Sequence, residues 1–300
     1  MLSLPSSLRV LINHPLTCGR PLFALARVAR WQVASRLFGG GILVDFVGGT
    51  RLVVRRGMSG ATGNVYYGLH EFQDMAFVIH FLRKGDLFAD IGANIGSYSI
   101  LASGVAKARS FAYEPAPATI RHLQDNVFLN RLGDLVTIRA AALGSTPAVV
   151  RFTANLDTVN HVALDSDPLP TSFECPVVRL DDDIKGDAPD LIKLDVEGFE
   201  SEVLAGAPRI LASPRLQAVI VELNGQSRKY GRDDEDVRQI LRENGFSRAI
   251  YDPISRRLDA PAAPMPGNSV TDNEIWVKNW TFVTDRLRQA PTVTVLGRAI

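Results

Sequence analysis

Short hydrophobic runs alternate with amphipathic stretches along most of the chain, and this alternation predicts its secondary structure. Apolar runs of four to six residues are typical of buried strands, whereas apolar positions three or four residues apart indicate helices. Strands are predicted at 87–91, 110–113, 136–139, 191–194 and 218–223, with helices between them at 97–106, 116–130, 200–211 and 234–244. This βα repetition predicts a mostly parallel sheet with helices on both faces.

The segments that flank this repeat follow other patterns. Further strands are expected at 42–46, 51–54, 149–152, 176–180, 246–251 and 274–277, and a further helix at 71–82. The first two of these strands are expected to form a hairpin across Gly48-Gly49. The last two have no helix between them, so we expect them to join the sheet edge as antiparallel strands.

The amino-terminal segment, residues 1–40, has a composition of its own. Five arginines precede the first acid, Asp45, and residues 21–37 carry apolar side chains at near-helical spacing. Three interpretations fit: a transit peptide, a basic amphipathic helix that contacts a membrane surface through residues 20–37, or a helix packed on the main domain. The last is favoured. Three glycines at 39–41 end this helical segment, and residues 41–300 are expected to form the main domain.

Composition narrows the class of protein. A hydrophobic fraction of 46%, a charged fraction of 22% and a net charge of +1 are ordinary for a soluble globular protein and indicate no nucleic-acid partner. The sequence has two cysteines, Cys18 and Cys175, which lie far apart and show no paired spacing. This pattern fits a protein of a reducing compartment and contains no metal-binding motif. No apolar stretch reaches the ~18 residues of a membrane span. A cytoplasmic protein is expected, with peripheral contact at the inner membrane surface as an option; its oligomeric state is left open.

The first predicted strand of the βα repeat leads into a glycine-containing loop. Asp90 ends the strand, and Gly92, Asn94 and Gly96 follow it before the next helix. Glycines let a backbone approach a ligand closely, and the helix start offers free amides. The loop matches neither the dinucleotide fingerprint nor a phosphate-binding loop. A carboxylate at Asp90 would repel phosphate, so a ligand with a cationic head is expected.

A second acid ends the next strand and makes the pattern more specific. Glu114 lies 24 residues after Asp90, in the position from which an acid accepts hydrogen bonds from both ribose hydroxyls of a bound nucleoside. Asp90, the glycine loop and Glu114 together favour a ligand that contains adenosine but no pyrophosphate. S-adenosylmethionine, with its ribose, ammonium and sulfonium, fits this description.

The segment 190–200 places three acids just after an apolar strand. Asp195 is interpreted as a polar contact to the methionine part of the cofactor or to the acceptor, and Glu197 as a general base. An alternative is Mg²⁺ binding by Asp195 and Glu197 with Glu222 or Asn224, although no metal is assigned. These acids could also have a purely structural role, because a negative charge stabilises the first turn of a helix. We favour that role for Glu200 and disfavour it for Asp195. For Glu197 the structural and the catalytic interpretation are evenly balanced.

Other residues are weaker candidates. Glu71, before the helix that leads into the first strand of the repeat, is interpreted as a contact to the cofactor's ammonium or to the acceptor. His70 could cap the site, Tyr66 and Tyr67 could form a wall of it, and His161 could act as a base on the acceptor side, but packing or solvated positions are favoured for these residues.

Three blocks of the sequence resemble the signature blocks of the FkbM-type methyltransferases. These blocks are residues 90–96, 113–115 and 192–200, and the stretches 142–144 and 221–223 are similar too. The resemblance covers residues 65–280 and implies a class I methyltransferase fold, a mostly parallel seven-stranded sheet with helices on both faces. It implies methyl transfer from S-adenosylmethionine to an oxygen of a small molecule or sugar. Cofactor-binding positions match at Asp90, Gly92, Asn94, Gly96 and Glu114, and Ala142 is assigned to the same site. The acceptor does not carry over, because the polar span at 153–165 differs among members.

In such a transfer the protein mainly aligns the acceptor oxygen with the methyl group, which lowers the activation barrier by up to ~7–11 kcal/mol in favourable cases. A positioned base adds ~10²–10⁴-fold for an alcohol acceptor. We therefore predict an S-adenosylmethionine-dependent O-methyltransferase for a hydroxyl of a sugar, glycolipid or secondary metabolite. The alternatives are a nicotinamide-dependent oxidoreductase, which Asp90 and the missing fingerprint disfavour, and a non-catalytic, membrane-associated binding protein with the same fold.

Overall fold

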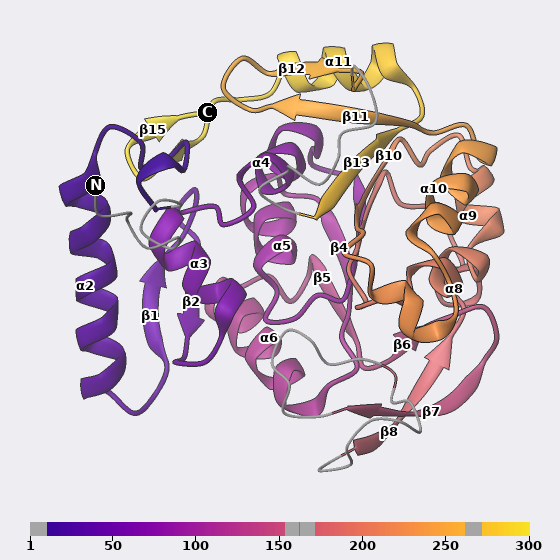
Figure 1. Ribbon diagram of the computed structural model, residues 1–300, viewed down its shortest axis with the longest axis horizontal. Coiled ribbons are helices and arrows are strands. Elements are labelled where there is room, and N and C mark those ends of the chain that lie inside the picture. The colour runs from indigo at the N-terminus through magenta and orange to yellow at the C-terminus, as the bar shows by residue number, and fades with distance from the viewer. Residues whose placement is uncertain (1–10, 154–161, 163–171, 262–271) are drawn as a thin grey trace.

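A twisted eight-stranded sheet forms the centre of the protein in the computed structural model, which describes residues 11–153, 162, 172–261 and 272–300 (Figure 1). The strand order is β12-β11-β13-β10-β9-β3-β4-β5. The strands are β3 (Leu87–Ile91), β4 (Arg109–Tyr113), β5 (Val136–Arg139), β9 (Leu191–Leu194), β10 (Ala218–Glu222), β11 (Ser247–Asp252), β12 (Arg257–Asp259) and β13 (Asn273–Val277). The first five run parallel, and β13, β11 and β12 are antiparallel additions at one edge.

The predicted strands of this sheet are confirmed to within one residue, and the antiparallel edge is confirmed as well. Seven of the strands form the sheet of a class I methyltransferase, and the short strand β12 extends it by one. The reversal of strand order lies between β3 and β9, and ligands of open α/β sheets bind beside the carboxyl ends of the strands at such a point.

Helices cover both faces of the sheet because alternate residues of each strand point to opposite sides. Leu191 of β9 packs with α4 (Phe72–Phe81) and α11 (Trp280–Arg288) on one face. Ile192, the next residue, packs with α8 (Glu200–Ala205), α9 (Pro208–Ala212) and α10 (Asp234–Glu243) on the other. A third hydrophobic cluster lies beneath α6 (Pro117–Leu129). The central strands therefore bury apolar side chains on both faces of the sheet, as a buried parallel sheet requires.

Two predicted helices differ from the structure. The single helix expected at 200–211 is wrong: the chain breaks into α8 and α9, since Pro208 cannot continue a helix but fits the first turn of a new one. The helix expected at 97–106 begins as α5 (Ser97–Ile100) and continues as a π-helical turn, η1 (Leu101–Val105). The acidic start of α10 forms a capping box between Asp233 and Asp236.

The amino-terminal helix α2 (Pro21–Leu37) lies at the edge of the molecule beside the hairpin β1 (Ile42–Asp45) and β2 (Arg51–Val54) (Figure 1). It packs on α3 (Ser59–Tyr67), a helix that the sequence pattern did not predict. Arg27 Nε donates to the Val65 carbonyl oxygen at 3.0 Å, and Gln32 Nε2 donates to Tyr66 Oη at 2.5 Å. Among the described helices, none combines the length and apolar character needed to cross a membrane.

A separate three-stranded sheet, β6-β8-β7, borders the carboxyl edge of the main sheet. Its strands are β6 (Ala142–Leu143), β7 (Ala148–Thr153) and β8 (Ser172–Val178). The strand expected at 176–180 ends earlier than predicted, because α7 (Leu180–Asp183) begins at Leu180. The remaining elements are η3 (Gln226–Tyr230) and the carboxyl-terminal pair β14 (Thr294–Val295) and β15 (Arg298–Ala299). His161 lies outside the described residues.

Candidate functional site

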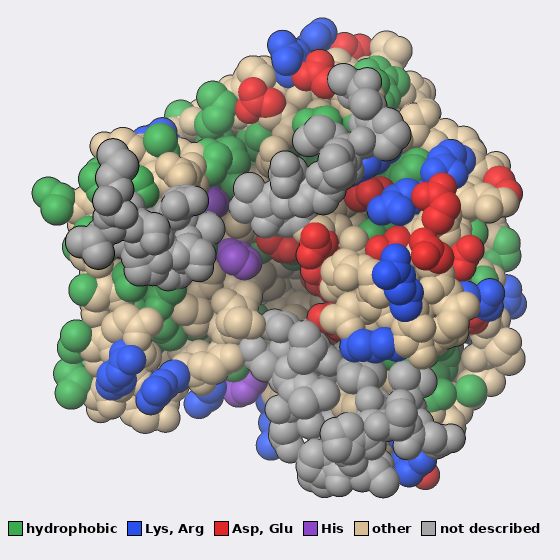
Figure 2. Space-filling model, in the orientation of Figure 1, with side chains coloured by type: hydrophobic (Ala, Val, Ile, Leu, Met, Phe, Trp, Pro, Cys, Tyr) green, Lys and Arg blue, Asp and Glu red, His purple; other side chains and the backbone are tan. Residues whose placement is uncertain are grey.

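A cavity of about 740 Å³ opens where the carboxyl ends of β3, β4, β9 and β10 meet. Helix α3 forms the wall opposite the strand ends, and Phe152 and Val162 add a third side. Figure 2 shows the hollow on this face of the molecule with acidic side chains at its rim. The structure therefore gathers loops that are far apart in sequence around one space.

The glycine loop lines the floor of this cavity. Gly92, Asn94 and Gly96 have φ angles of +81°, +50° and +90°, the left-handed region that glycine adopts most readily. A Cβ atom at Gly92 would lie 1.8 Å from the backbone oxygen of Asp195, so only glycine fits there. Gly92 and Asn94 line the cavity, whereas Gly96 supports it from behind, as the residue that caps α5 and packs near Leu123.

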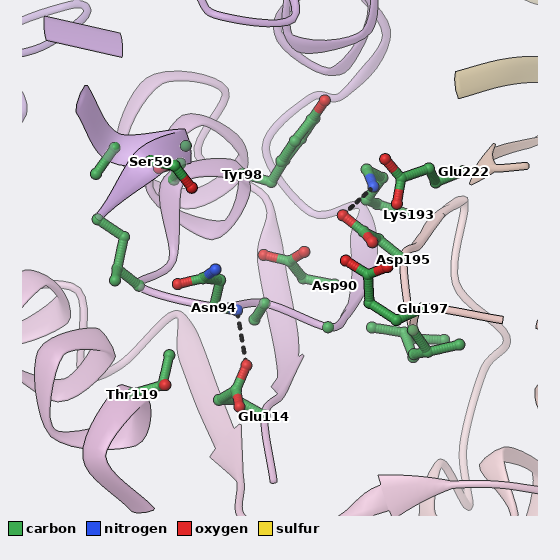
Figure 3. Close-up of a pocket in the computed structure, with 18 of the residues that line it drawn as sticks. Ser59, Asp90, Asn94, Tyr98, Glu114, Thr119, Lys193, Asp195, Glu197 and Glu222 are labelled. Carbon is green, nitrogen blue, oxygen red and sulfur yellow. Dashed lines mark hydrogen bonds and ion pairs between the residues drawn. The ribbon is translucent and has the colours of Figure 1, made fainter. Parts of the chain in front are cut away.

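Glu114 projects from the end of β4 towards this loop (Figure 3). Its Oε2 accepts from the Asn94 backbone amide at 3.0 Å and its Oε1 from the Ala116 amide at 2.8 Å. These two bonds fix the carboxylate and leave lone pairs on both oxygens for a ligand. Burial raises the pKa of Glu114 to about 7, although the two amides act in the opposite direction.

Asp90 and Glu71 lie further along the cavity. Asp90 is 1% exposed, and its Oδ2 accepts from Ser99 Oγ at 2.6 Å. Burial raises its pKa to about 6 against the lowering effects of that bond and of the Lys193 charge. Glu71 accepts from Tyr98 Oη at 2.8 Å and from Asn273 Nδ2 at 2.7 Å. Both acids are held in place by neighbours, and both face the space where a cationic group would lie.

The end of β9 carries an ion pair that the sequence interpretation missed. Lys193 Nζ, on a residue only 1% exposed, donates to Asp195 Oδ2 at 3.1 Å and lies 5.4 Å from the centre of the Tyr98 ring. Burial alone would lower the pKa of Lys193, but the carboxylates of Asp195, Glu71 and Glu222 raise it, so the ammonium persists at neutral pH. A charged residue inside an otherwise apolar strand was the signal that could have found it.

Glu222, at the end of β10, joins this pair. Burial would raise the pKa of Asp195, but Lys193 and a hydrogen bond with Glu222 bring it below its ordinary value. Burial and the Asp195 charge together raise the pKa of Glu222 strongly. The two carboxyl groups therefore titrate as a coupled pair, in which Asp195 is the stronger acid and Glu222 the weaker one.

Glu197 occupies a strained turn just after Asp195. Its φ is +56°, uncommon for a residue with a side chain, and its 8% exposed side chain accepts from Gln226 Nε2 at 3.0 Å. The adjacent Gly198 is packed so that a Cβ would lie 2.6 Å from the Gln226 backbone. Strain of this kind persists only where the surroundings impose it, and it is concentrated at functional sites.

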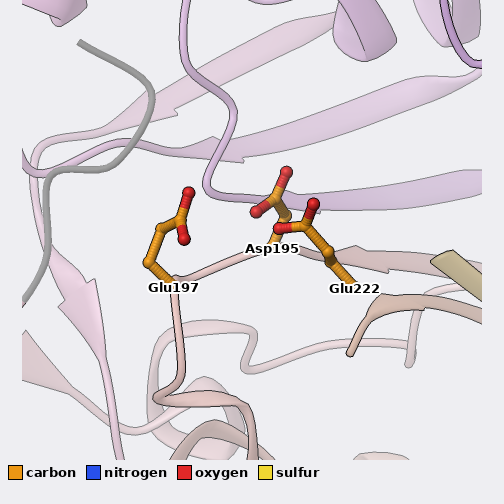
Figure 4. Close-up of side chains that lie close together, drawn as sticks. All are labelled: Asp195, Glu197 and Glu222. Carbon is orange, nitrogen blue, oxygen red and sulfur yellow. The ribbon is translucent and has the colours of Figure 1, made fainter. Parts of the chain in front are cut away.

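Three carboxyl groups converge at this end of the cavity (Figure 4). Ligand oxygens of Asp195, Glu197 and Glu222 lie within 4.8 Å of one another, and oxygens are the donors that Mg²⁺ prefers. The Lys193 ammonium already supplies one positive charge at Asp195. Asn224, named in the metal alternative, instead accepts from the Gln226 backbone amide through its Oδ1 and does not line the cavity.

Most residues that the sequence singled out meet in this one cavity. Those that line it are Glu71, Asp90, Gly92, Asn94, Glu114, Ala142, Asp195 and Glu197, with His70, Tyr66 and Tyr67. Glu200 does not line the cavity. Its Oε1 accepts hydrogen bonds from the Val196 and Gly198 backbone amides, just before α8 begins, which is the kind of structural role that the sequence favoured for it. Ser59, Asn64 and Thr119 also line the cavity but carried no recognisable sequence signal.

The strand order and this cavity define a Rossmann-like, class I methyltransferase fold. The family model of the methyltransferase FkbM domain matches residues 90–248, and the chain belongs to the FkbM methyltransferase family. Over 179 residues it is 30% identical to the hexuronic acid methyltransferase AglP of Haloferax volcanii, covering 56% of this chain and 66% of that protein.

Two further proteins are similar. The 31-O-demethyl-FK506 methyltransferase FkbM of Streptomyces tacrolimicus is 30% identical over 215 residues, covering 59% of this chain and 79% of that protein. The crystal structure of methyltransferase FkbM from Methylobacillus flagellatus KT matches with a TM-score of 0.44 and 17% identity, over 85% of this chain and 60% of that one. The match thus spans 66% of the Haloferax volcanii protein and 60% of the crystallised protein, less than two thirds of each.

Proposed function

We propose that the protein is an S-adenosylmethionine-dependent O-methyltransferase. The observation that carries this proposal is the convergence of Asp90, Glu114 and Asp195 with the glycine loop around one cavity. The family match favours methyl transfer over a nicotinamide-dependent oxidoreductase or a non-catalytic binding protein.

The donor set of the cavity fits each part of this cofactor. Glu114 would accept hydrogen bonds from the ribose hydroxyls, since its two oxygens are fixed by the Asn94 and Ala116 amides. Asp90 and Glu71 supply negative charge for the ammonium, and Ala142 lines the wall beside them. When bound, the cofactor supplies an electrophilic methyl group on a sulfonium.

The protein's part in the reaction is alignment and proton removal. Transfer of the methyl group to an alcohol oxygen forms a C–O bond, breaks the C–S bond and releases the hydroxyl proton. Glu197 is the proposed proton acceptor, and Asp195 the group that positions the acceptor or the methionine part. Asp195 is suited to positioning because Lys193 keeps it ionised and therefore a poor proton acceptor. Glu197 is better suited to accept a proton because its side chain is buried, and its positive φ angle marks a constrained turn at the site.

Titration calorimetry with S-adenosylhomocysteine tests the cofactor assignment. Binding with micromolar affinity and about one site per chain is the expected result. A folded protein that binds neither S-adenosylmethionine nor S-adenosylhomocysteine would overturn it. In the transfer assay, Glu197→Gln should reduce methyl transfer by about 10²–10⁴-fold while S-adenosylhomocysteine affinity changes little.

The charges of the cavity point to a neutral hydroxyl acceptor. Among the described lining residues, Lys193 is the one lysine or arginine, and six carboxyl groups surround it: Glu71, Asp90, Glu114, Asp195, Glu197 and Glu222. An anionic acceptor would meet like charge, whereas Ser59, Thr62 and Asn64 of the α3 wall suit sugar-type hydroxyls.

A matched pair of acceptors tests this class separately from cofactor use. Labelled S-adenosylmethionine is supplied with methyl glucoside or with methyl glucuronide, which differ by a carboxylate. Preferential labelling of the neutral glucoside is expected. Preferential labelling of the glucuronide would reject the neutral acceptor but leave cofactor binding intact.

We infer a cytoplasmic location from the two cysteines. Cys18 is exposed, Cys175 is buried, and both are free thiols, as is usual in a reducing compartment. Cell fractionation with an antibody to the protein would test this: a periplasmic or secreted pool would contradict it.

A further inference from the structure

The exposed residues of helix α2 form one continuous stripe along its outer side. From Leu22 onwards they are Leu22, Leu25, Ala26, Ala29, Arg30, Val33, Arg36 and Leu37, a spacing of three and four residues that keeps them on one face. Six of the eight are apolar. Leu22 is 80% exposed and Leu37 72%, so these side chains project from the surface.

The inner side of the same helix makes its polar contacts with the rest of the protein, whereas Arg36 in the stripe donates within the helix to the backbone and side-chain oxygens of Gln32. Arg27 and Gln32 bond to α3, while Ala24 and Trp31 are buried against the body of the protein. A helix on a water-facing surface normally buries its apolar stripe and exposes its polar one. Helix α2 exposes an apolar stripe while its opposite side packs on the protein.

Two further exposed apolar residues follow the helix in sequence. Phe38, directly after it, is 64% exposed, and Leu43 on the hairpin is 50% exposed. Figure 2 shows hydrophobic side chains projecting from the edge of the molecule at which α2 lies in Figure 1. Contiguous exposed apolar patches of this kind mark interaction sites.

The charge beside the stripe selects the partner. Arg30 and Arg36 belong to the stripe, and the sequence has no acid before Asp45. A partner surface must therefore be apolar and negatively charged. A second copy of the chain on a two-fold axis would bring the same arginines together, which costs energy.

We propose that the outer face of α2 docks on a membrane surface that carries anionic lipid headgroups. The apolar side chains enter the boundary between headgroups and acyl chains, and Arg30 and Arg36, in the same stripe, extend their long side chains to the phosphates. Because α2 packs on α3, docking places the α3 wall of the cavity beside the membrane. This proposal is independent of the enzymatic function.

Co-sedimentation of the full chain with lipid vesicles tests it. The protein should sediment with vesicles of phosphatidylglycerol and phosphatidylcholine, and much less with phosphatidylcholine alone or in high salt. The triple variant Leu25→Ser, Val33→Ser and Leu37→Ser should bind about tenfold more weakly or worse. Phe128→Ser is the matched control, since Phe128 is 86% exposed on α6, away from the stripe, and should bind like the parent chain.

Two measurements guard the interpretation. Thermal unfolding of the triple variant should stay close to that of the parent, because the three side chains are exposed. Failure of the parent chain to sediment, or equal sedimentation of parent and triple variant, would overturn the proposal. The proposal would also be overturned if light scattering showed that the parent chain is a dimer and the triple variant a monomer, because the stripe would then bind a second copy of the chain.

Discussion

The Nζ atom of Lys193 lies 3.1 Å from Oδ2 of Asp195, and the ammonium belongs to a fully buried strand residue whereas the carboxylate faces the cavity. The pair links the core of the sheet to the candidate site. Removing one partner of such a pair leaves the other charge uncompensated, which makes the interaction directly testable.

Replacement of Lys193 by Met should destabilise the protein by about 3–5 kcal/mol near neutral pH, because Asp195 loses its counter-ion. Without the ammonium the pKa of Asp195 rises, so protonation relieves the penalty and the loss should be smaller at pH 5 than at pH 8. Urea unfolding at both pH values measures this. Combining Lys193→Met with Asp195→Asn should recover part of the lost stability. If the destabilisation of the double variant equals the sum of those of the two single variants, the coupling is contradicted.

Glu114→Gln should weaken S-adenosylhomocysteine binding by about 10–100-fold, the expected value of losing hydrogen bonds to a charged group. The substitution preserves shape but removes one of the two acceptor oxygens that the Asn94 and Ala116 amides fix. Calorimetry measures the change. Asp125→Asn on the exposed surface of α6 is the control and should bind as tightly as the parent; unchanged affinity in Glu114→Gln would reject the ribose contact.

Cofactor binding should strengthen by about tenfold between pH 5.5 and pH 7.5. Burial raises the pKa of Asp90 to about 6 and of Glu114 to about 7, so both must lose protons to act as anionic acceptors in this range. The same shifts mean that the free folded protein holds protons which the unfolded chain has released, so they lower its stability as pH rises from about 4 to about 7.

Calorimetry in buffers of different ionisation enthalpy would detect the accompanying proton release. In Glu114→Gln, the part of the pH dependence centred near pH 7 should disappear. Affinity that is flat across the range, or that falls as pH rises, would contradict the proposed role of these two carboxylates.

Gly92→Ala should lower the free energy of unfolding by more than about 3 kcal/mol. Its φ is +81°, and the added Cβ would lie 1.8 Å from the Asp195 carbonyl oxygen, so the loop or the end of β9 must move. Gly133→Ala is the matched control: no atom lies within 4 Å of its Cβ position, and a change below about 1 kcal/mol is expected. Similar stabilities of the two variants would contradict the close approach.

Local sequence patterns predicted the sheet well because its central strands β3, β9 and β10 are buried on both faces and need continuous apolar runs. Leu191 and Ile192 illustrate this, since the two residues pack in separate cores. Helix α3 was not predicted, because its Ser, Gly and Thr residues have weak helix propensity and its place depends on contacts with α2. The break between α8 and α9 was missed although Pro208 marked it.

By itself, the sequence determined the strands of the main sheet other than β12, the glycine loop, the acids at Asp90, Glu114, Asp195 and Glu197, and the resemblance to the FkbM methyltransferases, since these depend on residue type and short-range spacing. Only the tertiary structure decided that Lys193 pairs with Asp195, that Glu222 titrates together with Asp195, and that α2 turns an apolar stripe outwards. These features depend on contacts between strands β9 and β10 and between helices α2 and α3, and the identity of such partners is set by packing rather than by neighbours in the chain.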